Sequence, residues 1–149
     1  MRRCVASFIL STLAACGGPS ASDFIGSWNR SGSQTITCNG TPTTNSFAGV
    51  LTIAAGTTSN QIIGTQPDGC QTTYTISGST ASATAGQTCT IAVTGGSWLV
   101  TVQSHTLVFS GSGGTGSTLA ATSSTTIAET VNGTTTNCTA SATGTFTKQ

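Results

Sequence analysis

Short runs in which apolar residues alternate with threonine or another polar residue are the feature that most restricts the fold of this chain. Examples lie at residues 70–77, 88–94 and 98–103. Successive side chains of a β-strand point to opposite faces, so each run suits a strand with one buried face. Threonine also favours strands, because its branched Cβ fits a pleated sheet. No window repeats apolar residues at helical spacing, and we therefore expect an all-β fold.

Turn signals separate these runs at short intervals along the chain. Most of them contain glycine, as β-hairpin connections do. About eight to ten short strands joined by such turns predict an antiparallel up-and-down meander, whose closure into a barrel removes exposed edges. We expect a single β-barrel domain over residues 23–149. The turn signals are Asn39-Gly40, Ala55-Gly56, Pro67-Asp68-Gly69, Ser77-Gly78-Ser79, Gly95-Gly96, Ser104-His105, Gly111 to Gly116 and Asn132-Gly133.

The first residues predict export and lipid attachment. A basic start, Met1-Arg2-Arg3, precedes an apolar run at residues 5–13 that has the length of a signal-peptide core and is too short to span a bilayer as a helix. The next residues, Leu13-Ala14-Ala15-Cys16, resemble the lipobox of bacterial lipoproteins. In that family the preceding peptide is removed and the cysteine carries acyl chains that anchor it in a membrane. We predict a signal peptide at residues 1–15 and lipidation of Cys16; a signal peptide cut elsewhere and a buried first strand are the alternatives.

The residues that follow Cys16 bear on location. Gly17 stands where an aspartate retains enterobacterial lipoproteins at the inner membrane, so the resemblance implies the outer membrane, on its periplasmic or its surface side. Residues 16–22 are rich in Gly and Ser, and we interpret them as the lipidated cysteine and a flexible tether. The sequence has no polybasic segment, so the lipid on Cys16 is the expected membrane contact.

Charged residues make up only 5% of the chain, against about 25% in an average globular protein. Such a composition also occurs in disordered chains, but the alternation described above favours a folded β domain. Without residues 1–15, two basic and three acidic residues remain, for a net charge of 2 − 3 = −1. No basic patch is present in the sequence, which argues against nucleic acid as a partner. The five charged residues are Arg30, Lys148, Asp23, Asp68 and Glu129.

Four cysteines lie in the predicted domain and suggest two disulfides, because an exported chain folds in an oxidising compartment. Cys70 and Cys89 are almost equidistant from the turn near Gly78, so they can face each other across a hairpin that contains a bulge. Cys38 ends the first strand pair and Cys138 lies in the last strand, and these strands are antiparallel neighbours in a closed barrel. Of three possible pairings we predict Cys70–Cys89 and Cys38–Cys138. The second closes a loop of roughly 100 residues, for about 4–5 kcal/mol in the chain-entropy account.

The start of the predicted domain resembles the opening of known barrels. Phe24-Ile25-Gly26-Ser27-Trp28 resembles the F-x-G-x-W opening of lipocalins and related calycin barrels, and Trp28-Asn29, Gly32 and Ile36 are similar to the first strands of avidin-type barrels. The resemblance implies a closed lipocalin-like barrel whose glycine allows close packing and whose tryptophan plugs one end. The whole Thr-, Ser- and Gly-rich pattern also resembles small lipoproteins of myxobacteria. This resemblance implies a cellular location and a fold but no activity.

The sequence offers little chemistry for catalysis, which needs clustered ionisable groups. We interpret His105 as a solvated turn residue rather than a member of a Ser–His–acid set. Glu129 shares the parity of its apolar neighbours, so it is either a strand end that faces water or a polar anchor in a cavity. Residues 111–116 match G-x-G-x-x-G but open no helix, and we read them as a hairpin loop. With no metal-ligand spacing either, we expect no enzyme, no metal and no cofactor.

Trp28, Tyr74 and Trp98, together with Phe109, are the side chains most able to line an apolar pocket. Equally large residues often form only the core. Two functions of different classes follow. One is a membrane-anchored, non-enzymatic module that holds a small apolar ligand in a cavity lined by the first three residues. The alternative is a structural or surface-interaction lipoprotein, with a filled core and a polar exterior that contacts envelope partners.

Overall fold

The computed structural model describes residues 18–149, and the predicted signal peptide, Cys16 and Gly17 lie outside them. The described residues form one antiparallel sheet of nine strands after a single short helix, which confirms the predicted all-β meander. The elements are α1 (Ala21–Phe24), β1 (Gly26–Cys38), β2 (Thr41–Ala55), β3 (Gln61–Thr65), β4 (Gln71–Ser77), β5 (Thr80–Ala83), β6 (Thr88–Val93), β7 (Gly96–Ser110), β8 (Thr118–Val131) and β9 (Thr134–Lys148).

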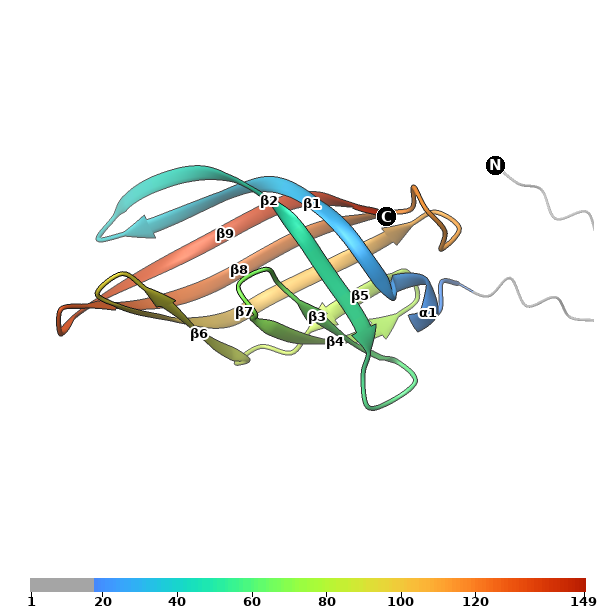
Figure 1. Cartoon of the computed structure of the whole chain (residues 1–149), viewed down its shortest axis with the longest axis horizontal. Helices are drawn as coiled ribbons and strands as arrows, with labels where there is room; N and C mark the ends of the chain where they lie inside the picture. Colours follow the sequence, from blue (N-terminus) through green and yellow to red (C-terminus); the bar gives the residue numbers. More distant parts are fainter. Residues whose placement is uncertain (1–17) are drawn as a thin grey trace, which may run out of the picture.

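Strand pairing closes into a circle at one end of the molecule only. The sheet order is β5-β4-β3-β2-β1-β9-β8-β7-β6, and β5 also pairs with β7, so eight strands form a hydrogen-bonded circle from which β6 is left out. We call this closed part the ring; it contains residues 26–30, 51–83, 104–123 and 142–148. Figure 1 shows α1 and β3–β5 at this end and the tips of the β1–β2 and β8–β9 hairpins at the opposite end.

The remaining strand segments form a curved sheet that is not closed by strand pairing. We call it the open half; it contains residues 31–50, 88–102 and 124–141. Its outer members are the first part of β2, which pairs with β3 only from Thr52 onward, and β6, which pairs with β7 alone. The sheet is therefore continuous through β1, β9 and β8 and interrupted between β2 and β6.

Strand β7 corrects the turn predicted at Ser104-His105. The strand runs without interruption, and the pairing with β8 shifts between Val102 and Ser104, which makes Gln103 the extra residue of a β-bulge. Because a bulge adds one residue, the inward-facing residues of β7 are even-numbered before it and odd-numbered after it. Val102 faces inward before it, and His105 and Leu107 face inward after it. In the sequence, this change of parity resembles the end of a strand.

Helix α1 was not predicted, and Ala21 and Ser22, at the end of the predicted tether, belong to it. Ser20 and Asp23 cap this short turn: the Ser20 backbone N–H donates to the Asp23 carboxylate over 2.7 Å, and the Asp23 N–H donates back to the Ser20 carbonyl. The helix places the fully buried Phe24 ring against the core at the end of the ring. Four residues give no periodicity that a sequence pattern can reveal.

The ring encloses the main core. Its inward side chains are large, apolar and almost completely buried, and Trp28 also donates its indole N–H to the Phe24 carbonyl over 2.8 Å. Lys148 helps to close the end beside α1, because its ammonium donates to the carbonyls of Asp23 and Gly113. The largest members are Phe24, Trp28, Leu51, Ile53, Ile62, Tyr74, Leu107, Phe109, Leu119 and Phe146.

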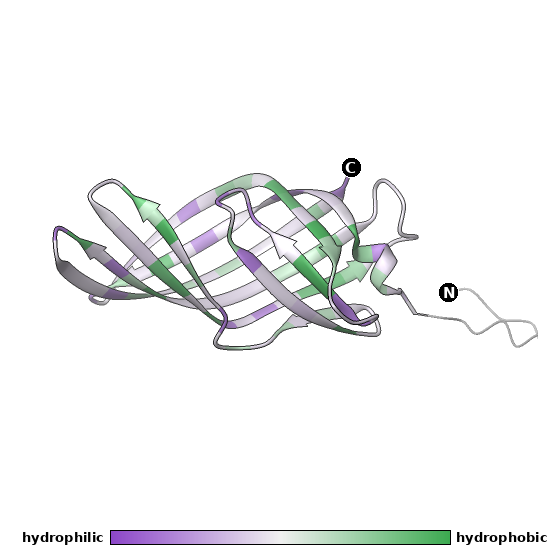
Figure 2. Ribbon diagram, turned by 60° about the horizontal axis from the view of Figure 1, so that its bottom comes forward, coloured by the Kyte–Doolittle hydropathy of each residue, from purple (hydrophilic) through white to green (hydrophobic). Residues whose placement is uncertain are grey.

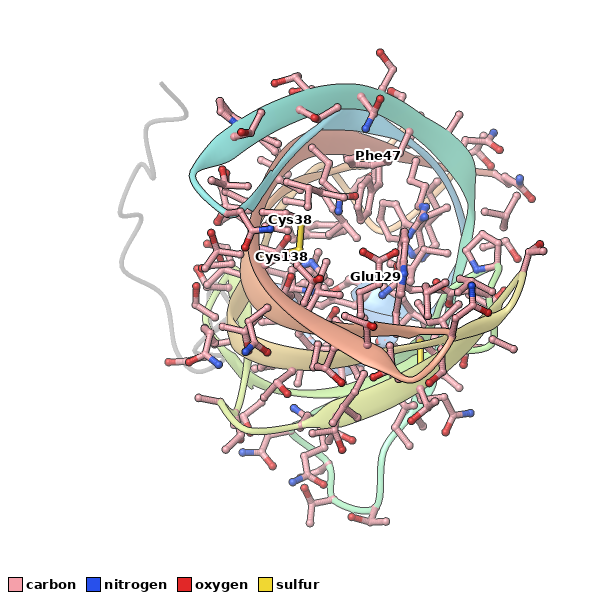
Figure 3. All side chains as sticks on the ribbon, turned by 90° about the vertical axis from the view of Figure 1, so that its left-hand side faces the viewer. Cys38, Phe47, Glu129 and Cys138 are labelled. Atoms are coloured by element: carbon pink, nitrogen blue, oxygen red, sulfur yellow. A yellow bond between two sulfur atoms is a disulfide. The ribbon has the colours of Figure 1, made fainter. Side chains whose placement is uncertain are left out.

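Both predicted disulfides are confirmed. Cys38 and Cys138 are direct partners in the β1–β9 pairing, with Cα atoms 4.3 Å apart, and their bond lies inside the open half (Figure 3). Cys70 and Cys89, with Cα atoms 5.7 Å apart, connect the β3–β4 turn to β6. They do not face each other across one hairpin, as predicted, because the β4–β5 hairpin ends at Ala83 and β6 pairs with β7. The first bond supports a small second cluster, in which Ile127 and Ala140 pack with Ile36, Trp98 and Val100.

Candidate functional site

A cavity of about 230 Å³ lies between the open half and the inner end of the ring. Inward residues of β1, β2 and β6–β9 form its walls, and the β3–β4 turn covers part of the interruption between β2 and β6. Figure 2 shows hydrophobic stretches near the end that α1 covers and paler, more polar stretches along the middle of the long strands. The residues that line the cavity are both polar, such as Gln34 and Gln66, and apolar, such as Trp98 and Val100.

Small residues on β1, β8 and β9 leave this space free. Gly32 and Gly144 are direct partners across the β1–β9 pairing, and the Phe47 ring of β2 packs over both. A Cβ added at Gly32 would meet the carbonyl of Thr143 and would lie 2.6 Å from the Phe47 ring, so no larger residue fits there. Other small inward lining residues of β8 and β9 are Ala121, Ser123, Ala140 and Ala142.

Arg30 is the cationic residue of the cavity wall. Its Nη1 donates a 2.6 Å hydrogen bond to the Gln66 side-chain oxygen, and the guanidinium lies 5.3 Å from the centre of the Phe47 ring. Nε is buried and has no hydrogen-bond partner within the protein. Burial lowers the pKa of Arg30, and the Asp68 carboxylate opposes this effect. The guanidinium remains a cation, since arginine keeps its proton even in protein interiors.

The β3–β4 turn, residues 66–70, brings Gln66 to Arg30. The Cys70 N–H donates to the Asp68 carboxylate over 2.9 Å, and the disulfide to Cys89 attaches the turn to β6. Gly49 of β2 has φ of +144°, which favours glycine, and a Cβ there would lie 3.0 Å from the Pro67 ring. Glycine at this position therefore lets the turn approach the strand that carries Phe47.

His105 corrects the prediction of a solvated turn histidine. It lies within β7, lines the cavity and shares a 2.9 Å hydrogen bond through Nδ1 with the Tyr74 hydroxyl, the two rings meeting edge to face. Burial, reinforced by the Arg30 charge, lowers the pKa of His105 to about 4. Burial also raises the pKa of Tyr74. Both side chains are therefore neutral at pH 7, and the pair adds hydrogen-bonding groups without charge.

Glu129 faces inward, one of the two orientations that the sequence left open, and Figure 3 shows it pointing toward the interior of the open half. Its carboxylate accepts a 2.8 Å hydrogen bond from the indole N–H of Trp98, its direct partner across the β7–β8 pairing. This bond fixes the indole that forms one wall of the cavity. Glu129 itself is not a lining residue.

Of the three predicted ligand-contacting residues, only Trp98 lines the cavity. Trp28 and Tyr74 are buried in the ring core, which was the competing interpretation, although Tyr74 reaches the site through His105. Arg30 and Phe47, which also line the cavity, were not among the predicted site residues. For Arg30 a signal existed, because it has the parity of Trp28 on β1 and so had to point inward as well.

The part of the chain that the structure describes has no cluster of three or more His, Cys, Asp or Glu side chains that suits a metal ion. Nor does a helix of sufficient length and apolarity to cross a membrane occur among residues 18–149. The glycine-rich residues 111–116 form the loop between β7 and β8, as predicted, and lie at the ring end. Comparison with protein-family models, curated proteins and solved structures finds no match to this chain.

Proposed function

We propose that this protein is a non-enzymatic binding module that holds a small molecule in the cavity between the open half and the ring, while the lipid on Cys16 anchors the module to the cell envelope. The cavity is the observation that carries the proposal. A structural protein needs only a filled core, and the ring already provides one. Space beside it, walled by fixed polar groups and apolar side chains, is the usual form of a ligand site.

The cavity volume limits the size of the ligand. Sites for drug-sized molecules measure roughly 300–1,000 Å³, and this one measures about 230 Å³. The ligand is therefore smaller than a sterol or a long acyl chain. The proposed apolar ligand also acquires polar contacts, because Gln34, Gln66 and Gln87 line the same space as Trp98 and Val100.

The two disulfides and the position of the first described residues support the envelope setting. Disulfides persist in oxidising compartments such as the bacterial periplasm and cell surface. The chain enters the domain through α1, at the ring end, and the open half lies at the opposite end (Figure 1). A lipid on Cys16 would hold the ring toward the outer membrane and leave the cavity accessible from the aqueous side.

Among the described residues, those that line the cavity do not form a set of groups suited to catalysis. Arg30 and Asp68 are the charged residues among those described that line the cavity, and His105 is neutral with a pKa of about 4. An imidazole with that pKa is a poor general base at neutral pH, because efficient proton transfer needs a pKa near the working pH. Binding without chemistry is the function that this set supports.

A cavity-filling variant tests the proposal. Ala142 lines the cavity from β9, and Ala142→Leu introduces three carbon atoms there. Ala120→Leu makes the same change on the exposed face of β8 and serves as the matched control. The probes are benzamide, hexanamide, benzoate and hexanoate, titrated by calorimetry and by ligand-observed NMR.

We expect at least one probe to bind the natural protein and the Ala120→Leu variant equally, and Ala142→Leu to weaken that binding tenfold or more. Binding that Ala142→Leu leaves unchanged would place the probe outside the cavity and contradict the proposal. No binding by any of the four probes would also contradict it and would favour the alternative function, a structural or surface-interaction lipoprotein.

A further inference from the structure

The guanidinium of Arg30 has more hydrogen-bond donors than the protein satisfies. Arginine carries five N–H donors in a planar fork. The structure gives one hydrogen bond to a protein acceptor, from Nη1 to Gln66, and leaves the buried Nε without one. A buried donor of a charged group that lacks a partner costs more free energy than a neutral one. Arg30 lines the cavity, and its guanidinium therefore has more N–H donors there than the protein satisfies.

No carboxylate neutralises this cation by direct contact in residues 18–149. Asp68 lines the same cavity and acts on Arg30 through space, but its side chain is exposed and its Oδ1 already accepts the Cys70 N–H. Glu129 is engaged by Trp98. His105 and Tyr74, which also bear on the site, are neutral at pH 7. The half-buried cation thus faces the cavity without an ion-pair partner.

The surroundings of Arg30 limit where a ligand can reach its guanidinium. Phe47 lies against the guanidinium, and Gln66 accepts a hydrogen bond from Nη1. Because Nε has no exposed surface, the remaining N–H groups of the two terminal nitrogens are the donors for a ligand in the cavity. The planar guanidinium matches the two oxygens of a carboxylate better than a point charge such as lysine does.

We infer that the ligand of this cavity is a small amphiphilic carboxylic acid, whose carboxylate binds the guanidinium of Arg30 and whose apolar body lies against the apolar wall. This inference rests on the proposed function. Phe47, Val100 and Trp98 provide apolar lining for a ring or a short alkyl chain. The volume of about 230 Å³ excludes a long-chain fatty acid.

Matched pairs of probes separate the effect of ligand charge on affinity from the effect of ligand shape. Benzoate and benzamide have almost the same shape, as do hexanoate and hexanamide, but only the acids are anionic at pH 7. We expect the better acid to bind at least about tenfold more tightly than its amide, because a charge-assisted bidentate contact is much stronger than a neutral one. We expect Arg30→Met to abolish this preference and to retain the affinity for the amide.

A second variant covers the case in which Arg30→Met fails to fold. Asp68→Asn removes the one negative charge of the cavity wall and keeps the side-chain oxygen that accepts the Cys70 N–H. It should strengthen acid binding about two- to fivefold, as expected for removal of one partly screened charge, and leave amide binding unchanged. Weaker acid binding in Asp68→Asn would overturn the inference.

The two proposals fail in different ways. Equal affinity for acid and amide in the natural protein, with Ala142→Leu still abolishing both, would overturn the carboxylate inference and leave the binding function intact. An acid preference that survives in a folded Arg30→Met variant would overturn the role of Arg30. No binding of any acid or amide would overturn both proposals.

Discussion

The ring and the open half use the same alternation of side chains and reach opposite results. In the ring, the inward positions hold large apolar residues, and Trp28, Leu107 and Leu119 are completely buried. Around the cavity, small residues such as Gly32 and Ala140 occupy inward positions of β1 and β9, and polar residues such as Gln34 alternate with only a few large apolar ones. The ring is filled and the open half borders a cavity, although both regions are parts of the same antiparallel sheet.

This difference shows how a chain with few large residues can divide its tasks. The large side chains are concentrated where eight strands close a circle, and there they form a core. The open half has no such closure, and both disulfides attach to it: one connects β1 to β9, and the other connects β6 to the β3–β4 turn. Covalent bonds thus stabilise the region whose interior is kept free for a ligand.

Removal of the disulfides should have the largest effect on stability. The Cys38–Cys138 bond joins residues 100 positions apart and the Cys70–Cys89 bond residues 19 apart. Loop entropy predicts losses of about 5 and 3 kcal/mol for the double alanine variants, respectively. Denaturant unfolding followed by circular dichroism measures both. A larger loss for the Cys70/Cys89 variant would show that the turn, rather than the β1–β9 pairing, limits the stability of the open half.

Truncation of the two tryptophans compares the two regions directly. Trp28 is completely buried in the ring and hydrogen-bonded to Phe24, so Trp28→Ala should cost about 3–5 kcal/mol or more. Trp98 is only partly buried beside the cavity, and Trp98→Ala should cost less than half as much. The effects on probe affinity should have the reverse order: among variants that remain folded, Trp98→Ala should weaken probe binding more than Trp28→Ala does. Equal costs in unfolding free energy would remove the distinction between the regions.

Acid should destabilise the protein through His105, which lies where the two regions meet. Its pKa falls from 6.5 to about 4 on folding. The unfolded chain therefore binds the proton first, and the stability present above pH 6.5 is lost as the pH falls toward 4. The loss should approach about 2–3 kcal/mol at pH 4. His105→Gln should be less sensitive to pH over this window in urea unfolding, and parallel curves for the two proteins would contradict the assignment.

The outer faces of the two regions should respond alike, and only slightly. Thr106 and Thr122 share a 2.7 Å hydrogen bond on the ring, and Thr35 and Thr44 share one of 2.8 Å on the open half. Such cross-strand pairs contribute roughly 0.2–1 kcal/mol relative to alanine. The double alanine variants of each pair should therefore lose less than about 1 kcal/mol in thermal unfolding. A large loss at either pair would mean that the exterior also distinguishes the regions.

The sequence was informative where one rule acted over many residues. Alternation predicted the strands, and the end positions of Cys38 and Cys138 predicted their disulfide. The Cys70–Cys89 pairing was right, but the hairpin from which it was inferred ends at Ala83, and Cys89 lies on β6, which pairs with β7. The turn signals also located most strand ends. Helix α1 was not predictable, because four residues have no period.

The site was harder to predict because it depends on single residues. The bulge at Gln103 moved His105 from a supposed turn into the cavity wall, and no local signal announces which residue of a strand is extra. Phe47 lies against Gly32 and Gly144, and only the strand register brings these three together. The prediction of the site relied on large aromatic residues, whereas the cavity exists because many inward residues are small.

The central claim is that the cavity between the open half and the ring binds a small molecule and that the ring core does not. Amide and indole NMR shifts of the isotope-labelled protein, titrated with hexanoate, test it most directly. We predict shift changes at Arg30, Phe47, Gln66 and the Trp98 indole, with Leu51 and Leu119 of the ring core unchanged. Changes centred on the ring core, or no saturable change at these residues, would contradict the account.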